Sequence, residues 1–244
     1  MLFIRKNRLT TLLATSLVLC SANGWSQSPN EKSEAEKTAE IAEQVALAAE
    51  LAAFGRGELA DVTGLKGVNS PEALVAAGGI LMRVHKQTGG KIAEVEAKVV
   101  DDANQSIPDE NTNFSFADEA ANLFDEARAM AKDKAAVETI IKQAESVTER
   151  GASGGPKVIS RTVKSGKSHK VDLAFEPHTP ATVTMHGNGV VKFEVVGPGG
   201  KVLWNSRGNW GVYRWMPGKA SERGITIKVI NGGGPAVSYT LTTN

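Results

Sequence analysis

The spacing of hydrophobic residues changes from a helical to a strand period near residue 150, and this change limits the chain to a protein with two kinds of segment. Before it, apolar residues recur every three or four positions in alanine-rich stretches. After it, apolar and polar residues alternate between glycine and proline turns. The glycine-rich residues 151–156 separate the two. The sequence therefore predicts an α+β protein with two separate domains, an α-helical domain at 39–150 and an antiparallel β-sandwich at 157–244.

Charge divides at the same place. Residues 27–150 contain 13 Lys and Arg against 23 Asp and Glu, whereas residues 151–244 contain 12 against 4. The formal net charge of +1 for the whole chain conceals this asymmetry. Opposite charges of this size favour docking of the acidic helical domain on the basic strand domain, an attraction that salt would screen.

The first 26 residues predict a secretory signal peptide. Basic residues precede an apolar run from Leu9 to Cys20, and small and polar residues follow it. The run is too short to span a bilayer, and no later segment is apolar enough to do so. Cys20 follows Leu19 where lipoprotein processing needs a small residue, so lipid anchoring is not expected. Residues 27–38 predict a flexible tether, although residues 28–38 also fit a frayed helix start. The mature chain is expected in the bacterial periplasm or outside the cell.

The helical segment predicts four or five amphipathic helices in a small bundle. Ser70 and Pro71 form a typical helix start, Gly89 a typical end, and Ser115 caps a later helix. Residues 91–100 are predicted as a short helix. Adjacent carboxylates in this segment, such as Asp118 and Glu119, point in different directions on a helix and are interpreted as solvated charges, not metal ligands.

The strand segment predicts two packed antiparallel sheets. Its short alternating runs are separated by turn residues at the spacing of a sandwich. The runs are Val158 to Val163, Ser168 to Phe175, Ala181 to His186, Val190 to Val196, Lys201 to Trp204, Val212 to Trp215, Gly224 to Ile230 and Ser238 to Thr242.

Several stretches of this segment resemble the bacterial pre-peptidase C-terminal domain. They are residues 163–168, 171–175, 181–185, 193–203, 225–234 and 238–241. The resemblance covers roughly residues 157–244. It implies a jelly-roll-like sandwich of the kind appended to secreted enzymes and used for anchoring, export or polymer binding. Residues 191–194 lack the acidic residues common in the family, so the family's cation site is not expected, and the helical segment resembles no peptidase.

No catalytic or metal-binding constellation is apparent. Residues 151–155 fit the pattern Gly-x-Ser-x-Gly, but they follow a polar helix and precede a proline, which favours a linker over a nucleophile elbow. The four histidines, of which His178 and His186 could approach across a hairpin, lack metal-ligand spacing. No cofactor is expected.

Aromatic and basic residues gather between residues 204 and 219. Trp204 and Trp215 are expected in the core of the sandwich. Trp210 lies in a predicted loop and is the first candidate for ligand contact. The predicted binding residues are Trp210, Arg207, Tyr213 and Arg214.

These patterns favour an exported, non-enzymatic binding or anchoring protein of the cell envelope. Its basic domain would contact an anionic polymer, a glycan or a partner protein; nucleic acid is not expected. One alternative is a structural scaffold or accessory subunit that acts through the helical domain, which burial of Trp210 would favour. Another is a secreted hydrolase that uses two of the acids of the strand domain, Asp172, Glu176, Glu194 and Glu222.

Overall fold

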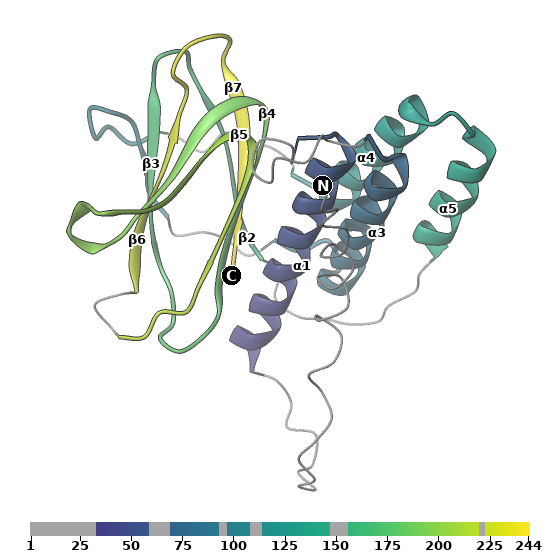
Figure 1. The fold of residues 1–244 in the computed structure, drawn as a ribbon. Helices are drawn as coiled ribbons and strands as arrows, with labels where there is room; N and C mark the ends of the chain where they lie inside the picture. The colour runs from purple at the N-terminus through teal and green to yellow at the C-terminus, as the bar shows by residue number, and fades with distance from the viewer. Residues whose placement is uncertain (1–32, 59–68, 93–96, 108–113, 147–155, 220–222) are drawn as a thin grey trace, which may run out of the picture. The chain divides into compact units, whose positions relative to one another are not determined.

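The computed structural model describes residues 33–58, 69–92, 97–107, 114–146, 156–219 and 223–244. The predicted signal peptide and residues 151–155 of the predicted linker lie outside these ranges. The described residues form four helices and a curled antiparallel sheet, so the α+β class is confirmed (Figure 1). Helices and strands pack together within one compact unit, Ser33–Asn244, so a division into two separate domains is not confirmed.

Helix α1 (Glu34–Gly55) begins earlier than the sequence predicted. Ser33 and Glu36 form a capping box, in which the Ser33 hydroxyl accepts from the Glu36 amide at 3.2 Å and the Glu36 carboxylate accepts from the Ser33 amide at 2.8 Å. Of the two alternatives for the end of the predicted tether, residues 34–38 form the helix start, and residues 27–32 lie outside the described residues. Composition alone missed the cap, because Ser33 and Glu36 also fit a solvated segment.

The other helix boundaries follow their sequence signals. Helix α3 (Pro71–Thr88) starts at the Ser70 cap and ends at Gly89, whose φ of 61° favours glycine. Helix α4 (Phe116–Met130) starts after Ser115, whose hydroxyl accepts from the amides of the first turn. Helix α5 (Lys134–Ser146) follows closely and packs on α3 and α4.

A glycine allows α3 and α4 to approach closely in the helical core. A Cβ atom on Gly78 would lie 2.5 Å from Cε1 of Phe124 on α4, which is shorter than any real contact of this type. Phe124 and Phe116 are almost fully buried here together with Leu74 and Ile141. The alanine and glycine content of the helices therefore serves close packing around a few large side chains.

Seven strands form one curled sheet, and a second packed sheet is not confirmed. The order is β1-β3-β6-β4-β7-β2, with β5 on the free side of β4. The strands are β1 (Val99–Val100), β2 (Lys157–Val163), β3 (Ser168–Ala174), β4 (Ala181–Val196), β5 (Val202–Trp215), β6 (Gly224–Ile230) and β7 (Val237–Thr243). A single-turn 3-10 helix, Pro198–Gly200, joins β4 to β5.

Two predicted turns are absent from the long β4–β5 hairpin. The predicted strands at 181–186 and 190–196 are one strand, because residues 187–189 continue the chain with a shift of register instead of a turn. The predicted strands at 201–204 and 212–215 likewise join into β5. The predicted helix at 91–100 is wrong at its end, where Val99 and Val100 pair with β3. Two β-branched residues fit a pleated edge better than a short isolated helix.

Helix α1 lies between the strands and the other helices (Figure 1). Ile41, Val45, Ala48 and Ala52 belong to the helical core. A second stripe of buried alanines, Ala39, Ala42, Ala46 and Ala53, lies outside that core. Glu43 and Glu50, on the same side of α1, contact Arg214 of β5, so this alanine stripe faces the strands. It covers a polar sheet surface that contains the buried Thr182, Thr184 and Thr242.

Candidate functional site

A row of four side chains crosses the strands on the face that α1 and α4 approach. In register, Trp210 of β5 pairs with His186 of β4, His186 with Thr240 of β7, and Thr240 with Ser160 of β2. Alternation along each strand places these four residues on the outer face, opposite the core residues Met185 and Tyr239. We call this set the His186 row.

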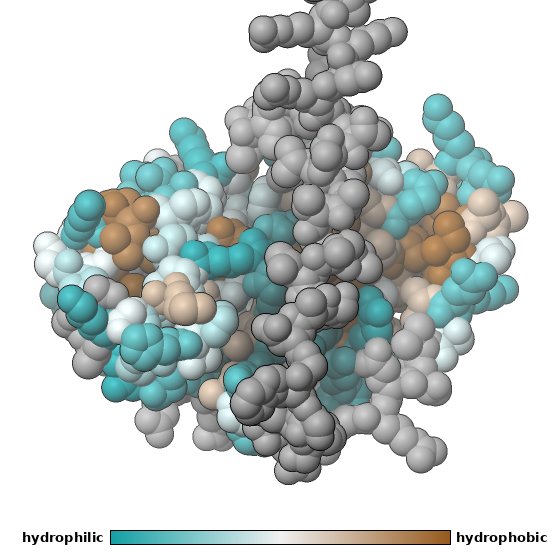
Figure 2. Space-filling model, turned by 60° about the horizontal axis from the view of Figure 1, so that its bottom comes forward, coloured by the Kyte–Doolittle hydropathy of each residue, from teal (hydrophilic) through white to brown (hydrophobic). Residues whose placement is uncertain are grey.

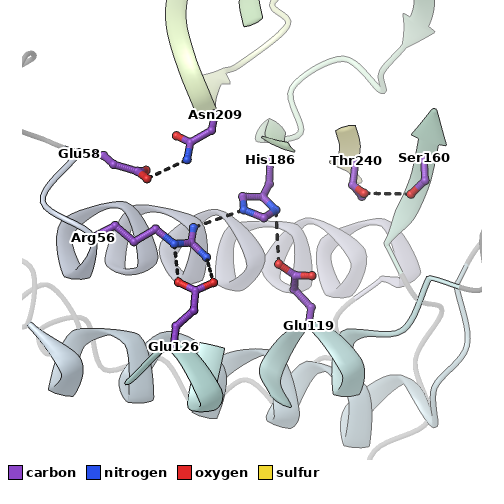
Figure 3. Close-up of polar contacts among 8 residues, drawn as sticks. All are labelled: Arg56, Glu58, Glu119, Glu126, Ser160, His186, Asn209 and Thr240. Carbon is purple, nitrogen blue, oxygen red and sulfur yellow. Dashed lines mark hydrogen bonds and ion pairs between the residues drawn. The ribbon is translucent and has the colours of Figure 1, made fainter. Parts of the chain in front are cut away.

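Charged side chains from the helical segment contact the His186 ring from two sides (Figure 3). Arg56, directly after α1, lies with its Nη1 atom 3.3 Å from Nε2 of His186. Glu119, in the first turn of α4, lies with Oε1 3.3 Å from Nδ1 of the same ring. Arg56 also donates through Nε and Nη2 to the two carboxylate oxygens of Glu126, both at 2.7 Å. Glu126, Arg56, His186 and Glu119 therefore form one connected series of polar contacts.

The contacts fix the protonation of His186. An arginine has donors only, so the Nε2 atom that faces Arg56 must be the acceptor and the proton must sit on Nδ1, toward Glu119. Burial lowers the pKa of His186, Glu119 opposes this shift and Arg56 adds to it. The neutral ring is thus the form that this site stabilises.

Stability is expected to fall as pH drops below about 6.5, the usual pKa of histidine. Since the pKa of His186 is lowered in the folded chain, the unfolded chain takes up the proton first. The stabilising contribution is present above the unfolded pKa and is lost as pH falls through the folded one, with a slope of at most about 1.4 kcal/mol per pH unit. Urea unfolding of the parent chain and of His186→Gln at several pH values measures it.

The same charged neighbours surround position 186 in both proteins of that comparison. Arg56 and Glu58 approach from the end of α1, and Glu119 and Glu126 approach from α4. Subtracting the pH profile of His186→Gln removes the titration of these neighbours. Parallel profiles of unfolding free energy against pH for the two proteins would contradict the assignment of this pH dependence to His186.

Three cavities meet at His186 and Glu119, which line all of them. The first, the apolar pocket, lies between α1 and α4 and is small, about 50 Å³. The second, the carboxylate cleft, has a volume of about 520 Å³ and is lined by Arg56, Glu119, Asn122, Asp125, Glu126, His186, Gly187, Asn188 and Asn209. The third, the hydroxyl groove, has a volume of about 250 Å³.

The hydroxyl groove presents two hydroxyl pairs between neighbouring strands. Ser160 and Thr240 lie 2.9 Å apart through their oxygens, and Thr162 and Ser238 lie 3.0 Å apart. Asn188 accepts from the amide of Ser238 at 3.0 Å. The complete lining is Phe114, Glu119, Ser160, Arg161, Thr162, His186, Gly187, Asn188, Ser238, Tyr239 and Thr240.

Acidic helical residues also engage the basic strand β5. Arg214 donates to Glu43 at 2.7 and 2.9 Å and to Glu50 at 2.6 Å. Asn209 donates to Oε1 of Glu58 at 2.7 Å (Figure 3). These contacts match the direction of the charge asymmetry that the sequence contains.

The four binding residues predicted from the sequence do not form one site. Trp210 is half-buried in the His186 row, and Arg214 lies on the same face, where it pairs with α1. Tyr213 points to the opposite face, because neighbours in a strand alternate, and packs against the sheet core. Arg207 is exposed in the other half of β5, opposite Lys192.

Tyr213 belongs instead to an aromatic row along β5. Its ring lies 6.0 Å from Trp204 and is stacked 5.1 Å from Trp215. Phe193 and Phe175 contact the two tryptophans edge-on from the core. Burial raises the pKa of the Tyr213 phenol. The row extends the core to the edge of the sheet.

The acids considered for a hydrolase are held in separate contacts. Asp172 accepts from Thr226 at 2.6 Å, Glu176 pairs with Arg223 at 3.0 Å, and Glu194 pairs with Lys192 at 2.5 Å. Asp172 lines a cavity of about 250 Å³ that neither Glu176 nor Glu194 lines. Glu222 lies outside the described residues.

Exposed apolar side chains occur in both the strand segment and the helices. The large exposed apolar side chains of the described residues are Val190, Val202, Leu203 and Met216 in the strand segment and Leu47, Phe54 and Ile140 in the helices. Figure 2 shows one face on which hydrophobic side chains gather separately over the strands and over the helices. In the described ranges no group of three or more His, Cys, Asp and Glu residues is arranged to hold a metal ion. Nor do these ranges contain a helix with the length and hydropathy needed to cross a membrane.

Comparison with known proteins gives structural likenesses only. No protein-family model matches the sequence, and neither does any curated protein. Among solved structures, the Yersinia pseudotuberculosis-derived mitogen aligns with 37% of this chain and 85% of its own at 9% identity and a TM-score of 0.32. PliG, a periplasmic inhibitor of g-type lysozyme from Aeromonas hydrophila, covers 36% of this chain and 86% of its own at 14% identity and a TM-score of 0.28.

A family GH115 4-O-methyl-α-glucuronidase aligns with 84% of this chain but only 33% of its own length, at 9% identity and a TM-score of 0.25. Scores and identities this low say nothing about function. The resemblance to pre-peptidase C-terminal domains stays a prediction from the sequence.

Proposed function

We propose that the protein is an exported, non-enzymatic binding protein of the cell envelope that holds a glycan chain in the hydroxyl groove. The observation that carries the proposal is the composition of the groove around Ser160, Thr162, Ser238 and Thr240. Each hydroxyl can donate and accept a hydrogen bond, as each hydroxyl of a sugar can. A groove lined by several such groups matches a polyhydroxylated ligand better than it matches an apolar or a purely anionic one.

Phe114 supplies an apolar wall for the same groove. It is half-buried, and its ring is held edge-on against Phe116 at 4.9 Å. Ligand sites commonly combine apolar walls with a few fixed polar groups that set orientation. A pyranose ring has one polar rim and one apolar face, so it can use both features at once.

The neighbouring carboxylate cleft extends the groove along α4. Both cavities are lined by Glu119, His186, Gly187 and Asn188. Asn122 and Asn209 add amide groups farther along the cleft. The continuous lining supports binding of a chain of several sugar units, not a single sugar.

An anionic polymer has less support as the ligand. Arg214, one of the basic residues expected to attract it, is already paired with Glu43 and Glu50. Arg161, the cation that lines the groove, is buried and donates to the backbone carbonyl of Ser160 at 2.7 Å. Arg56, which lines the adjoining cleft, is paired with Glu126. The export signal expected in residues 1–26 and the resemblance to anchoring domains agree with a place in the envelope.

The proposal is tested by co-sedimentation of the purified chain from residue 27 with insoluble chitin, cellulose and cell-wall sacculi. Binding to at least one polysaccharide is expected. Thr240→Val should then weaken binding about fivefold, since it removes one hydrogen-bonding hydroxyl worth about 1 kcal/mol at nearly constant volume. Thr226→Val is the matched control, because Thr226 lies on β6 and does not line the groove. Retention of the chain in the supernatant with every polysaccharide would contradict the proposal, as would equal binding of the two variants.

A further inference from the structure

Glu119 holds a special position among the charged residues of the site. Among the described residues it is the only carboxylate that lines the apolar pocket, the carboxylate cleft and the hydroxyl groove together. Its side chain is 27% exposed, so it is accessible to a ligand and yet partly shielded from water. Charge at such a position acts on a ligand more strongly than charge at a fully exposed one.

The other carboxylates of the cleft already have cationic partners. Glu126 accepts both of its hydrogen bonds from Arg56. Asp125 accepts from Arg128 at 2.8 Å. In the described contacts Glu119 pairs with His186 alone, and the contact between His186 and Arg56 requires that this ring be neutral.

The cleft therefore has an excess of negative charge. Its charged lining consists of one guanidinium, from Arg56, and the carboxylates of Glu119, Asp125 and Glu126. A ligand with carboxylates would meet repulsion from Glu119, whereas an ammonium group would complete an ion pair there. Charge complementarity of this kind selects between ligands of similar shape.

We propose that the groove and cleft select a glycan that carries free, protonated amino groups, with Glu119 as the residue that binds the ammonium. This inference rests on the proposed function and specifies its ligand class. The hydroxyl pairs of the groove would bind the sugar rim. Glu119, at the junction of the groove and the cleft, would bind an amino substituent on the same chain.

Four soluble probes test the inference with the unmodified chain: the tetramers of glucosamine, N-acetylglucosamine and galacturonic acid, and tetralysine. Affinities are measured by calorimetry in a mildly acidic buffer in which the sugar amines are protonated. The glucosamine tetramer is expected to bind about tenfold more tightly than the acetylated one, as for a hydrogen bond to a charged group. The galacturonic acid tetramer is expected to bind most weakly of the sugars.

Two variants test whether Glu119 is the residue that causes the preference for the glucosamine tetramer. Glu119→Gln keeps the shape and a hydrogen bond to His186 but removes the charge, so it should lower affinity for the glucosamine tetramer about tenfold and that for the acetylated tetramer less than about twofold. Asp118→Asn is the matched control. Asp118 precedes Glu119 on α4, is exposed and does not line the cavities described above.

The outcomes separate this inference from the function on which it rests. Equal or tighter binding of the acetylated tetramer would overturn the amine selection and leave the glycan groove standing. Equal loss of affinity in Asp118→Asn would overturn the role of Glu119. If none of the sugars binds, or if tetralysine binds as tightly as the glucosamine tetramer, the glycan function itself is wrong.

Discussion

Replacing Arg56 with alanine is expected to lower the free energy of unfolding by about 2 kcal/mol. Removal of one partner from a buried ion pair costs about 3–5 kcal/mol because it leaves the other charge without compensation. The side chain of Arg56 is 17% exposed, but that of its partner Glu126 is 40% exposed, so solvent reduces the loss. His186 also loses its donor. Urea unfolding at neutral pH measures the change.

Arg128→Ala is the matched control for this experiment. Arg128 likewise pairs with two carboxylates, Asp125 at 2.8 Å and Glu138 at 2.9 Å, but its side chain is 40% exposed. The expected loss is about 0.5 kcal/mol, as for other surface ion pairs. Equal losses in the two variants would mean that the contacts of Arg56 contribute no more than a surface pair.

Replacing Phe193 with alanine is expected to lower the free energy of unfolding by about 3–5 kcal/mol, the usual cost of removing a buried phenylalanine ring. Phe193 lies in the second half of β4 and is completely buried. Its ring packs edge-on against Trp204 at 5.5 Å, and a Cβ on Gly211 would lie 2.8 Å from it. The cavity would therefore lie between β4 and the aromatic row of β5. Thermal and urea unfolding of the variant measure the loss.

Val190→Ala provides the comparison on the same strand. Val190 is 60% exposed at the bend of β4, and a change within about 0.5 kcal/mol is expected there. The tryptophan fluorescence of Phe193→Ala should also shift, because Trp204 gains space and water. A small loss of stability with unchanged fluorescence would show that the site collapses without a cavity.

Helix boundaries were predictable where capping residues stand beside an apolar repeat. Ser70 with Pro71 and Ser115 both cap helices as their sequence context predicts. Ser33 also caps a helix, but its charged neighbours resemble a disordered tether in composition. The start of α1 depends on one reciprocal pair of hydrogen bonds, which composition cannot detect.

The strands were predicted better than their connections. Strand β2 and strand β6 lie where alternation placed them. Residues 187–189, with two glycines, predicted a turn, yet pairing with both β5 and β7 keeps His186 and Gly187 within one strand. Tertiary pairing overrode a local signal.

The candidate site was largely invisible in the sequence. Arg56 and Glu126 are 70 positions apart, and Arg56 and His186 are 130 apart, so no local motif joins them. The sequence singled out Trp210 because it lies between Asn209 and Gly211 in a predicted loop. The sequence contains one usable signal for His186. It follows Thr182 and Thr184 at every second position of the strand, so the three polar side chains share one face. Thr182 and Thr184 are buried on that face.

The alanine stripe of α1 sets how closely the helix approaches the strands. Ala39, Ala42, Ala46 and Ala53 keep the helix one methyl group away from the sheet surface that contains Thr182, Thr184 and Thr242. Arg56 and His186 meet across this same contact. A larger side chain at any of the four positions would push the helix outward and separate Arg56 from His186. Single changes in α1 could therefore alter the carboxylate cleft, which both residues line, with every residue of the cleft left in place.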